Sequence, residues 1–159
     1  MMTKRAIPLL LAAVLLSPVV QAEDDYDKAL HVYGCADYPK AFSLFKPLAE
    51  QGMALAQYQI GLMTEQGQGA DPDVKQAFPW YMKAAQQGVA DAYFALGQIY
   101  SRGEAVPKDK VQAYAWFALA HRGGNAVAGD WLRDEAKGMT AEQIAQGEKR
   151  AEAWKSTGK

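Results

Sequence analysis

The sequence predicts an all-α fold, an α-solenoid in which antiparallel helix pairs stack one after another. Two observations predict it: a self-match at an offset of 36 residues, and a loop-and-cap pattern that recurs at the same offset. When residues 54–89 are aligned with residues 90–125, ten of the 36 positions are identical. A fixed period of about 20 to 50 residues is typical of stacked repeat architectures, which usually work as binding surfaces.

The first helix of the repeat unit is expected over Ala54–Glu65. Ala56, Ile60 and Met63 fall on one side of it at helical spacing, which is typical of a helix that buries one face. Gly67 and Gly69 follow and indicate a break, because glycine adopts positive φ at low cost.

The second helix of the unit should begin after Asp73. An aspartate followed three residues later by Gln76 matches a capping box, and Asp109 with Gln112 repeats the arrangement 36 residues on. Gly88 ends the helix. Between cap and glycine the helix carries the apolar residues Ala77, Trp80, Tyr81 and Ala84, among others.

Flanking segments extend the stack to four helical pairs, two of them regular. Residues 23–53 form an N-terminal pair with a shortened loop, whose first helix is expected over Tyr26–Tyr33. Residues 126–159 form the C-terminal capping helices, where Thr140 and Gln143 make another capping box. Polar terminal helices are what a repeat stack needs to close its exposed ends.

Residues 1–22 are expected to be a cleavable signal peptide. Lys4 and Arg5 precede an apolar run over Ile7–Val20, and small residues at the peptidase positions predict cleavage after Ala22. The run is too short and too interrupted by proline for a comfortable membrane span, so we expect no stable membrane insertion after cleavage. An uncleaved anchor is the alternative. The expected location is the periplasm or the extracellular space.

The charge balance argues against a nucleic-acid partner. The chain carries a net charge of −1, and loss of Lys4 and Arg5 with the signal peptide would move it to −3. Nucleic-acid binders show a basic footprint instead. We expect a monomer. Cys35 is the only cysteine, so it cannot form an internal disulfide. We expect it to be buried, and the alternative is a thiol free for an intermolecular bond.

Several motifs resemble those of Sel1-like repeat proteins, relatives of the tetratricopeptide class. They are Leu48-Ala49-Glu50-Gln51-Gly52, Ala56-Gln57-Tyr58-Gln59-Ile60-Gly61 with its counterpart Ala92-Tyr93-Phe94-Ala95-Leu96-Gly97, and Trp80-Tyr81-Met82-Lys83-Ala84-Ala85. The resemblance implies a solenoid that binds proteins or peptides on its concave face, with no catalytic residues and no cofactor. One departure is Thr64, which stands where this family usually has an aromatic residue. Tyr100 restores it in the next unit, so the first regular unit should pack more loosely.

In repeats of this class the first helix of each pair lines the concave face. The side opposite the core stripe then gives candidate binding residues for a protein or peptide partner: Tyr58, Leu62, Glu65, Phe94, Gln98 and Arg102. Tyr58 and Phe94 fall at equivalent places and could clamp an extended peptide. The alternative is that both rings are packed between neighbouring units.

Signals of catalysis or metal binding are weak. His31 and Cys35 are two candidate ligands, too few for a zinc site, so no metal is expected. Ser43 and Lys46 match the S-x-x-K pattern of penicillin-recognising enzymes, but the companion S-D-N and K-T-G motifs are absent. The favoured function is a non-catalytic exported scaffold or adaptor. The alternatives are a β-lactam-binding or hydrolytic enzyme on the same repeats, and a structural envelope component that uses its outer face.

Overall fold

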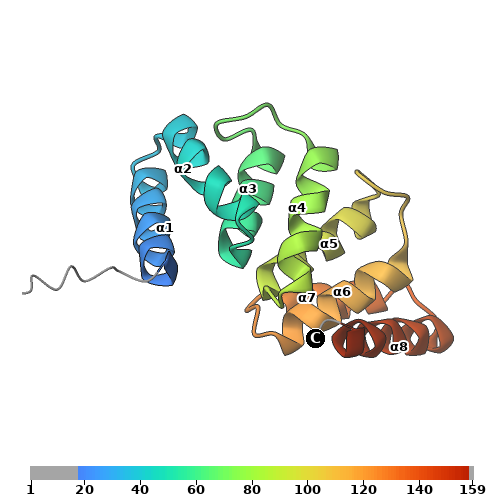
Figure 1. The fold of residues 1–159 in the computed structure, drawn as a ribbon. Helices are drawn as coiled ribbons and strands as arrows, with labels where there is room; N and C mark the ends of the chain where they lie inside the picture. Colours follow the sequence, from blue (N-terminus) through green and yellow to red (C-terminus); the bar gives the residue numbers. More distant parts are fainter. Residues whose placement is uncertain (1–17, 158–159) are drawn as a thin grey trace, which may run out of the picture.

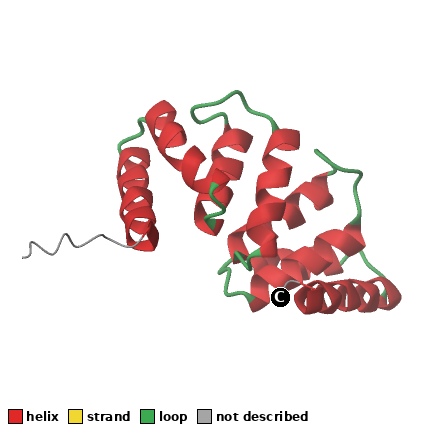
Figure 2. Ribbon diagram, viewed as in Figure 1, coloured by secondary structure: helices red, strands yellow, loops and turns green. Residues whose placement is uncertain are grey.

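The computed structural model describes residues 18–157, and all regular structure in this range is α-helical (Figures 1 and 2). Along these residues the helices are α1 (Pro18–Gly34), α2 (Tyr38–Glu50), α3 (Ala54–Gln66), α4 (Val74–Gln86), α5 (Ala90–Arg102), α6 (Lys110–Arg122), α7 (Ala128–Ala136) and α8 (Ala141–Thr157). Helices that follow each other from α1 to α7 pack together, and α8 lies back against α6. The result is an open arch with α1 at one end and α7 and α8 at the other (Figure 1). The expected all-α solenoid is confirmed.

Glycine ends the first helix of each regular unit, as expected. Gly67 has φ +71° and Gly103 has φ +77°, both in the left-handed region. Their backbone N–H groups donate to the carbonyl oxygens of Met63 and Ile99. These two glycines therefore satisfy carbonyl groups that the helix would otherwise leave unpaired.

Capping side chains begin the following helices at the expected positions. The Asp73 carboxylate accepts hydrogen bonds from the backbone N–H groups of Lys75 and Gln76 at 2.8 and 3.1 Å. The Asp109 carboxylate accepts from the Gln112 N–H at 3.0 Å. In each case the carboxylate accepts a hydrogen bond from a backbone N–H group that has no partner within the first turn of the helix.

The cap of α8 is a full capping box. The backbone N–H of Thr140 donates to Oε1 of Gln143 at 2.9 Å, and the Gln143 N–H donates to Oγ1 of Thr140 at 3.2 Å. The prediction made from these two residues is confirmed in both directions.

The buried apolar side chains form two clusters, each shared by several helices. One cluster joins α1, α2 and α3 around Phe45, Ile60 and Met63. The other joins α4, α5, α6 and α8 around Tyr81 and Leu96. Because both clusters run across helix pairs, neither is complete within one pair, which is how a repeat stack is stabilised.

Two expectations for the N-terminal region need correction. The first helix was expected over Tyr26–Tyr33, but α1 begins at Pro18 and includes Ala22, whose side chain packs against the first cluster. Cys35 is exposed rather than buried. The reason is that α1 ends at Gly34, so Cys35 lies in the turn before α2 and on neither inward helix face.

Residues 1–17 of the expected signal peptide lie outside the described residues. Among the helices described between residues 18 and 157, none is long and apolar enough to cross a membrane.

Candidate functional site

The candidate face is built on close contacts between an aromatic ring and a helical glycine. A Cβ atom added to Gly61 of α3 would lie 2.8 Å from two ring carbons of Tyr81 on α4. A Cβ on Gly97 of α5 would lie 2.5 Å from a ring carbon of Phe117 on α6. Both contacts are shorter than van der Waals distance, so in each unit only glycine lets the ring of the second helix lie on the backbone of the first.

These buried rings hold the candidate aromatics in place. The centroid of Tyr58 lies 6.0 Å from that of Tyr81, and the centroid of Phe94 lies 5.7 Å from that of Phe117. Both distances are typical of attractive aromatic pairs. Tyr58 and Phe94, which occupy equivalent positions in the repeat, therefore also pack in the same way, each against the buried ring of the second helix.

Around Tyr58 the face carries acidic groups. The Tyr81 hydroxyl donates a hydrogen bond to Oε2 of Glu65. Burial, then the nearby charges of Asp91 and Glu65, raise the pKa of Tyr58 to about 12. The Tyr58 hydroxyl consequently stays neutral across the physiological range and can donate a hydrogen bond.

Phe94 lies between two further rings. Its centroid is 5.6 Å from Trp131 on α7, and Phe117 is 5.7 Å from the same tryptophan. Trp131 nevertheless keeps 37% of its surface exposed. Phe94 is thus in contact with the next unit, as the packing alternative predicts, and the trio of Phe94, Phe117 and Trp131 forms one half-open aromatic cluster.

Polar contacts reinforce the junction of α5 with the C-terminal helices. The Ser101 hydroxyl donates to Oε2 of Glu135 at 2.8 Å, and the Asn125 amide donates to Oδ1 of Asp91 at 2.7 Å. Sequence reasoning missed Trp131 as part of this face. The signal was a tryptophan among the charged residues of Asp130–Glu135, which the repeat pattern does not cover.

The other candidate residues lie along the same two helices. Leu62 is half-buried against the second cluster, and Gln98 is half-buried on α5. Arg102 is exposed at the end of α5, where its guanidinium lies 3.9 Å from the Glu104 carboxylate. An ion pair this exposed contributes little to stability, so the Arg102 charge remains usable for a partner.

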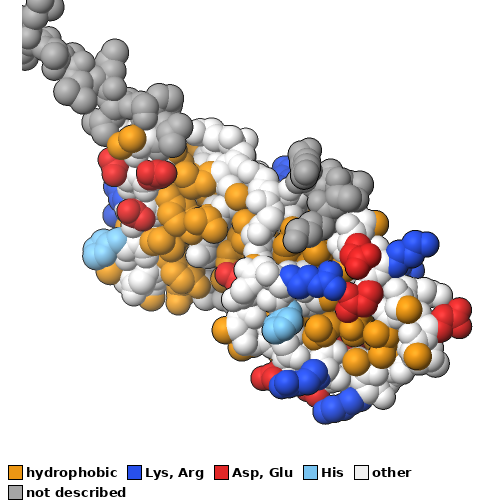
Figure 3. Space-filling model, turned by 90° about the horizontal axis from the view of Figure 1, so that it is seen from below, with side chains coloured by type: hydrophobic (Ala, Val, Ile, Leu, Met, Phe, Trp, Pro, Cys, Tyr) orange, Lys and Arg blue, Asp and Glu red, His pale blue; other side chains and the backbone are white. Residues whose placement is uncertain are grey.

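The underside of the arch shows where apolar surface gathers. Hydrophobic side chains form a broad band toward the N-terminal end, and a second, smaller patch lies toward the C-terminal helices (Figure 3). Charged side chains stand around and between these areas (Figure 3).

The weaker motifs fall on ordinary helical positions. Ser43 is exposed on α2, and its hydroxyl donates to the Lys40 carbonyl at 2.7 Å, which is a local helix contact. Within the described residues, no group of three or more His, Cys, Asp or Glu side chains lies together as metal ligands would.

Comparison with models of known protein families identifies the family of the chain. The Sel1 repeat model matches residues 36–53, 54–89 and 90–125, which is more than half of the sequence. The chain belongs to the Sel1 repeat family. A search of curated proteins finds no match.

Two solved structures are similar in fold. One is a protective antigen present in uropathogenic Escherichia coli strains, described as displaying an SLR fold. It has 31% identity and a TM-score of 0.79, over 84% of this chain and 29% of that one. The other is a Sel1 repeat protein from Oxalobacter formigenes, with 27% identity and a TM-score of 0.67, over 81% of this chain and 55% of that one. The chain therefore spans about a third and about half of the lengths of these two proteins. Repeat folds of this kind commonly mediate protein interactions.

Proposed function

We propose that the chain is an exported, non-catalytic scaffold that binds a protein or peptide partner along the face of its first helices. The observation that carries the proposal is a row of partly exposed aromatic residues on three successive first helices: Tyr58 on α3, Phe94 on α5 and Trp131 on α7. Rigid aromatic side chains that keep exposed surface are typical anchors of protein interfaces.

Rigidity is what distinguishes these rings from ordinary surface residues. Tyr58 packs against Tyr81, and Trp131 packs against Phe94 and Phe117. A ring already held in place loses little side-chain entropy when a partner covers it, so more of the contact energy appears as affinity. Gln98 and Arg102 supply polar groups further along α5.

Position-dependent cross-linking tests this proposal. A photo-reactive amino acid at Gln98 is preferable to one at Phe94, because Phe94 is part of the aromatic cluster and its replacement would disturb packing. The control carries the same group at Lys149, which is exposed on α8. We expect an envelope protein to be captured from Gln98 and not from Lys149.

A charge reversal makes the test specific to the face. Arg102→Glu should reduce capture from Gln98, whereas Lys149→Glu, a matched reversal on α8, should leave it unchanged. Both variants should retain the helical circular dichroism of the wild type. Capture from Lys149 alone, or capture from Gln98 that ignores Arg102→Glu, would contradict the assignment of this face.

Export is part of the same proposal and has its own measurement. Mass spectrometry of the chain recovered from a Gram-negative periplasm should give a mature N-terminus at Glu23. Reversal of both charges at Lys4 and Arg5 should leave the precursor in the cytoplasm. A full-length chain in both cases would contradict cleavage after Ala22.

A further inference from the structure

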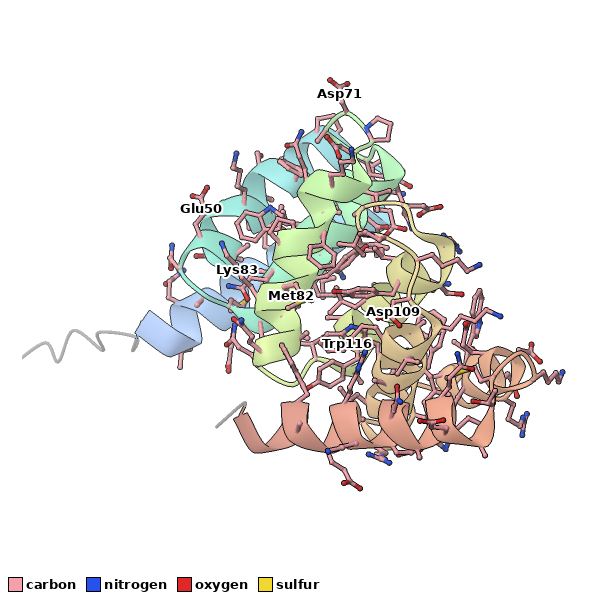
Figure 4. All side chains as sticks on the ribbon, turned by 90° about the vertical axis from the view of Figure 1, so that its right-hand side faces the viewer. Glu50, Asp71, Met82, Lys83, Asp109 and Trp116 are labelled. Carbon is pink, nitrogen blue, oxygen red and sulfur yellow. The ribbon has the colours of Figure 1, made fainter. Side chains whose placement is uncertain are left out.

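A cavity of about 250 Å³ lies apart from the candidate residues. Its walls come from α2, α3 and α4, where Phe42, Thr64 and Trp80 line it, and from the loop that joins α3 to α4. Asp71 also lines the cavity and lies at the tip of this loop, at the edge of the arch (Figure 4). None of the six candidate residues of the first helices lines this cavity.

The equivalent region of the next repeat unit can be compared with the cavity, residue by residue. A shift of 36 residues moves α2, α3 and α4 onto α4, α5 and α6. Half of the lining positions keep their character in this shift. The conserved or similar pairs are Phe42 with Phe78, Ile60 with Leu96, Gln76 with Gln112, and Trp80 with Trp116.

The remaining positions become larger or more apolar one unit on. Thr64 corresponds to Tyr100, and Ala70 corresponds to Val106. Tyr100 fills its place directly, because its centroid lies 6.1 Å from that of Phe78 in an edge-to-face contact. Tyr100 and Val106 both pack against the second core cluster. The cavity therefore lies at the repeat positions where the next unit has a tyrosine ring and a larger aliphatic side chain.

Charged groups replace apolar or uncharged ones at two further positions of the cavity lining. Lys46 stands where Met82 packs against the core, and Asp71 stands where Pro107 lies. Both charged residues are exposed. A peptide bound in the cavity has main-chain groups that these charges can meet.

We propose that this cavity is a binding site for an aromatic side chain of a partner, with tyrosine preferred, whose ring takes the place that Tyr100 has in the following unit. The volume is sufficient, since an apolar cavity of about 150 Å³ accommodates a benzene molecule. Thr64 is buried and its hydroxyl already donates to the Ile60 carbonyl at 2.7 Å. That hydroxyl needs no partner from the ligand, so the inner wall accepts an apolar ring.

A phenol fits better than a plain ring because of the capping carboxylate nearby. In the following unit the Asp109 backbone N–H donates to the Tyr100 carbonyl at 3.1 Å, and here the Asp73 N–H donates to the Thr64 carbonyl at 3.0 Å in the same way. After burial, the charge of Asp109 is the next cause that raises the pKa of Tyr100. The counterpart of Asp109 is Asp73, whose carboxylate begins α4 beside the cavity residue Gln76. A tyrosine bound in the same orientation directs its hydroxyl toward Asp73.

Binding of p-cresol, the side-chain analogue of tyrosine, tests the site. Titration of the full chain, followed by backbone amide NMR, should shift the resonances of Thr64, Ala70 and Trp80 in a saturable manner. Thr64→Tyr should weaken this binding by at least about tenfold, because the new ring fills the cavity. Thr64→Val keeps the side-chain volume and should bind as the wild type does. Equal binding by Thr64→Tyr and the wild type, or no saturable shift in the wild type, would overturn the proposal.

A reciprocal variant and a second probe complete the test. Tyr100→Thr should create a second cavity, and p-cresol should raise its thermal midpoint by more than it raises that of the wild type. 4-Methylcyclohexanol has the same heavy atoms on a puckered, non-aromatic ring and should bind the wild type more weakly than p-cresol. Equal binding of the two probes would overturn the assignment to an aromatic side chain. Arg102→Glu, which tests the candidate face, should leave p-cresol binding unchanged.

Discussion

Replacement of Gly97 by alanine tests the contact on which the candidate face is built. The added Cβ would lie 2.5, 2.6 and 3.1 Å from three ring carbons of Phe117. That ring cannot move aside easily, because Phe117 is fully buried and packs against Phe94 and Trp131. The variant should therefore be less stable than the wild type, although alanine is the better helix former.

Two opposing contributions set the change in the free energy of unfolding. Overpacking a well-filled core costs about 1–3 kcal/mol, and the short distances favour the upper end of that range. Alanine in a helix interior gains about 1 kcal/mol over glycine. The net loss for Gly97→Ala is about 2 kcal/mol. With a urea m-value of about 2 kcal/mol/M, the unfolding midpoint should fall by about 1 M.

A double-mutant cycle assigns the loss to the ring. Phe117→Leu alone destabilises the core, but in the Gly97→Ala background it also removes the steric clash. The double variant should therefore be more stable than the sum of the single effects by at least about 1 kcal/mol. Urea denaturation followed by far-ultraviolet circular dichroism provides all four free energies of unfolding. Additive effects, or a Gly97→Ala variant as stable as the wild type, would refute the assigned clash.

Three further predictions concern individual side chains. Burial first, then Asp91 and Glu65, raise the pKa of Tyr58 from 10.0 to about 12, so its contribution to stability is full below pH 10 and lost as pH rises toward 12. Tyr58→Phe should accordingly reduce the fall of the urea midpoint over that range. Burial alone would raise the pKa of Asp109, but hydrogen bonds from Gln112 and Arg150 lower it overall. Asp109→Ala should therefore cost about 1 kcal/mol at pH 7, and its difference from the wild type should shrink as the pH falls below the ordinary carboxyl pKa of 3.8. Cys35 is exposed, so Ellman's reagent should titrate one thiol in the native chain without denaturant, and a thiol that reacts only after unfolding would contradict this position.

Much of the fold could be predicted because its signals are local. Asp73 and Asp109 cap helices as their spacing predicted, and Gly67 and Gly103 end helices in the left-handed region. A cap or a C-terminal glycine depends on atoms within a few residues, so its pattern is visible in the sequence. The 36-residue period then indicated that the helix pair defined by these local patterns repeats and stacks.

The aromatic cluster of the candidate site was less predictable because its contacts with Trp131 join different units. Trp131 stands beyond the last regular repeat, and nothing local indicates that its ring meets Phe94. The exposure of Cys35 depends on where α1 ends relative to α2 and not on the compartment. In both cases the deciding contact lies between elements that the sequence pattern describes separately.

The sequence by itself determined the helix pairs, their order and their caps, because hydrogen bonds and apolar periodicity act over one or two helical turns. It also marked Thr64 as a departure from the repeat. Only the tertiary structure decided that a cavity lies beside this residue. The cavity beside Thr64 needs walls from three helices and a loop, and the volume among them depends on how closely the helices approach. Approach distances are set by side-chain packing between helices, as Gly61 and Gly97 show against the rings of Tyr81 and Phe117.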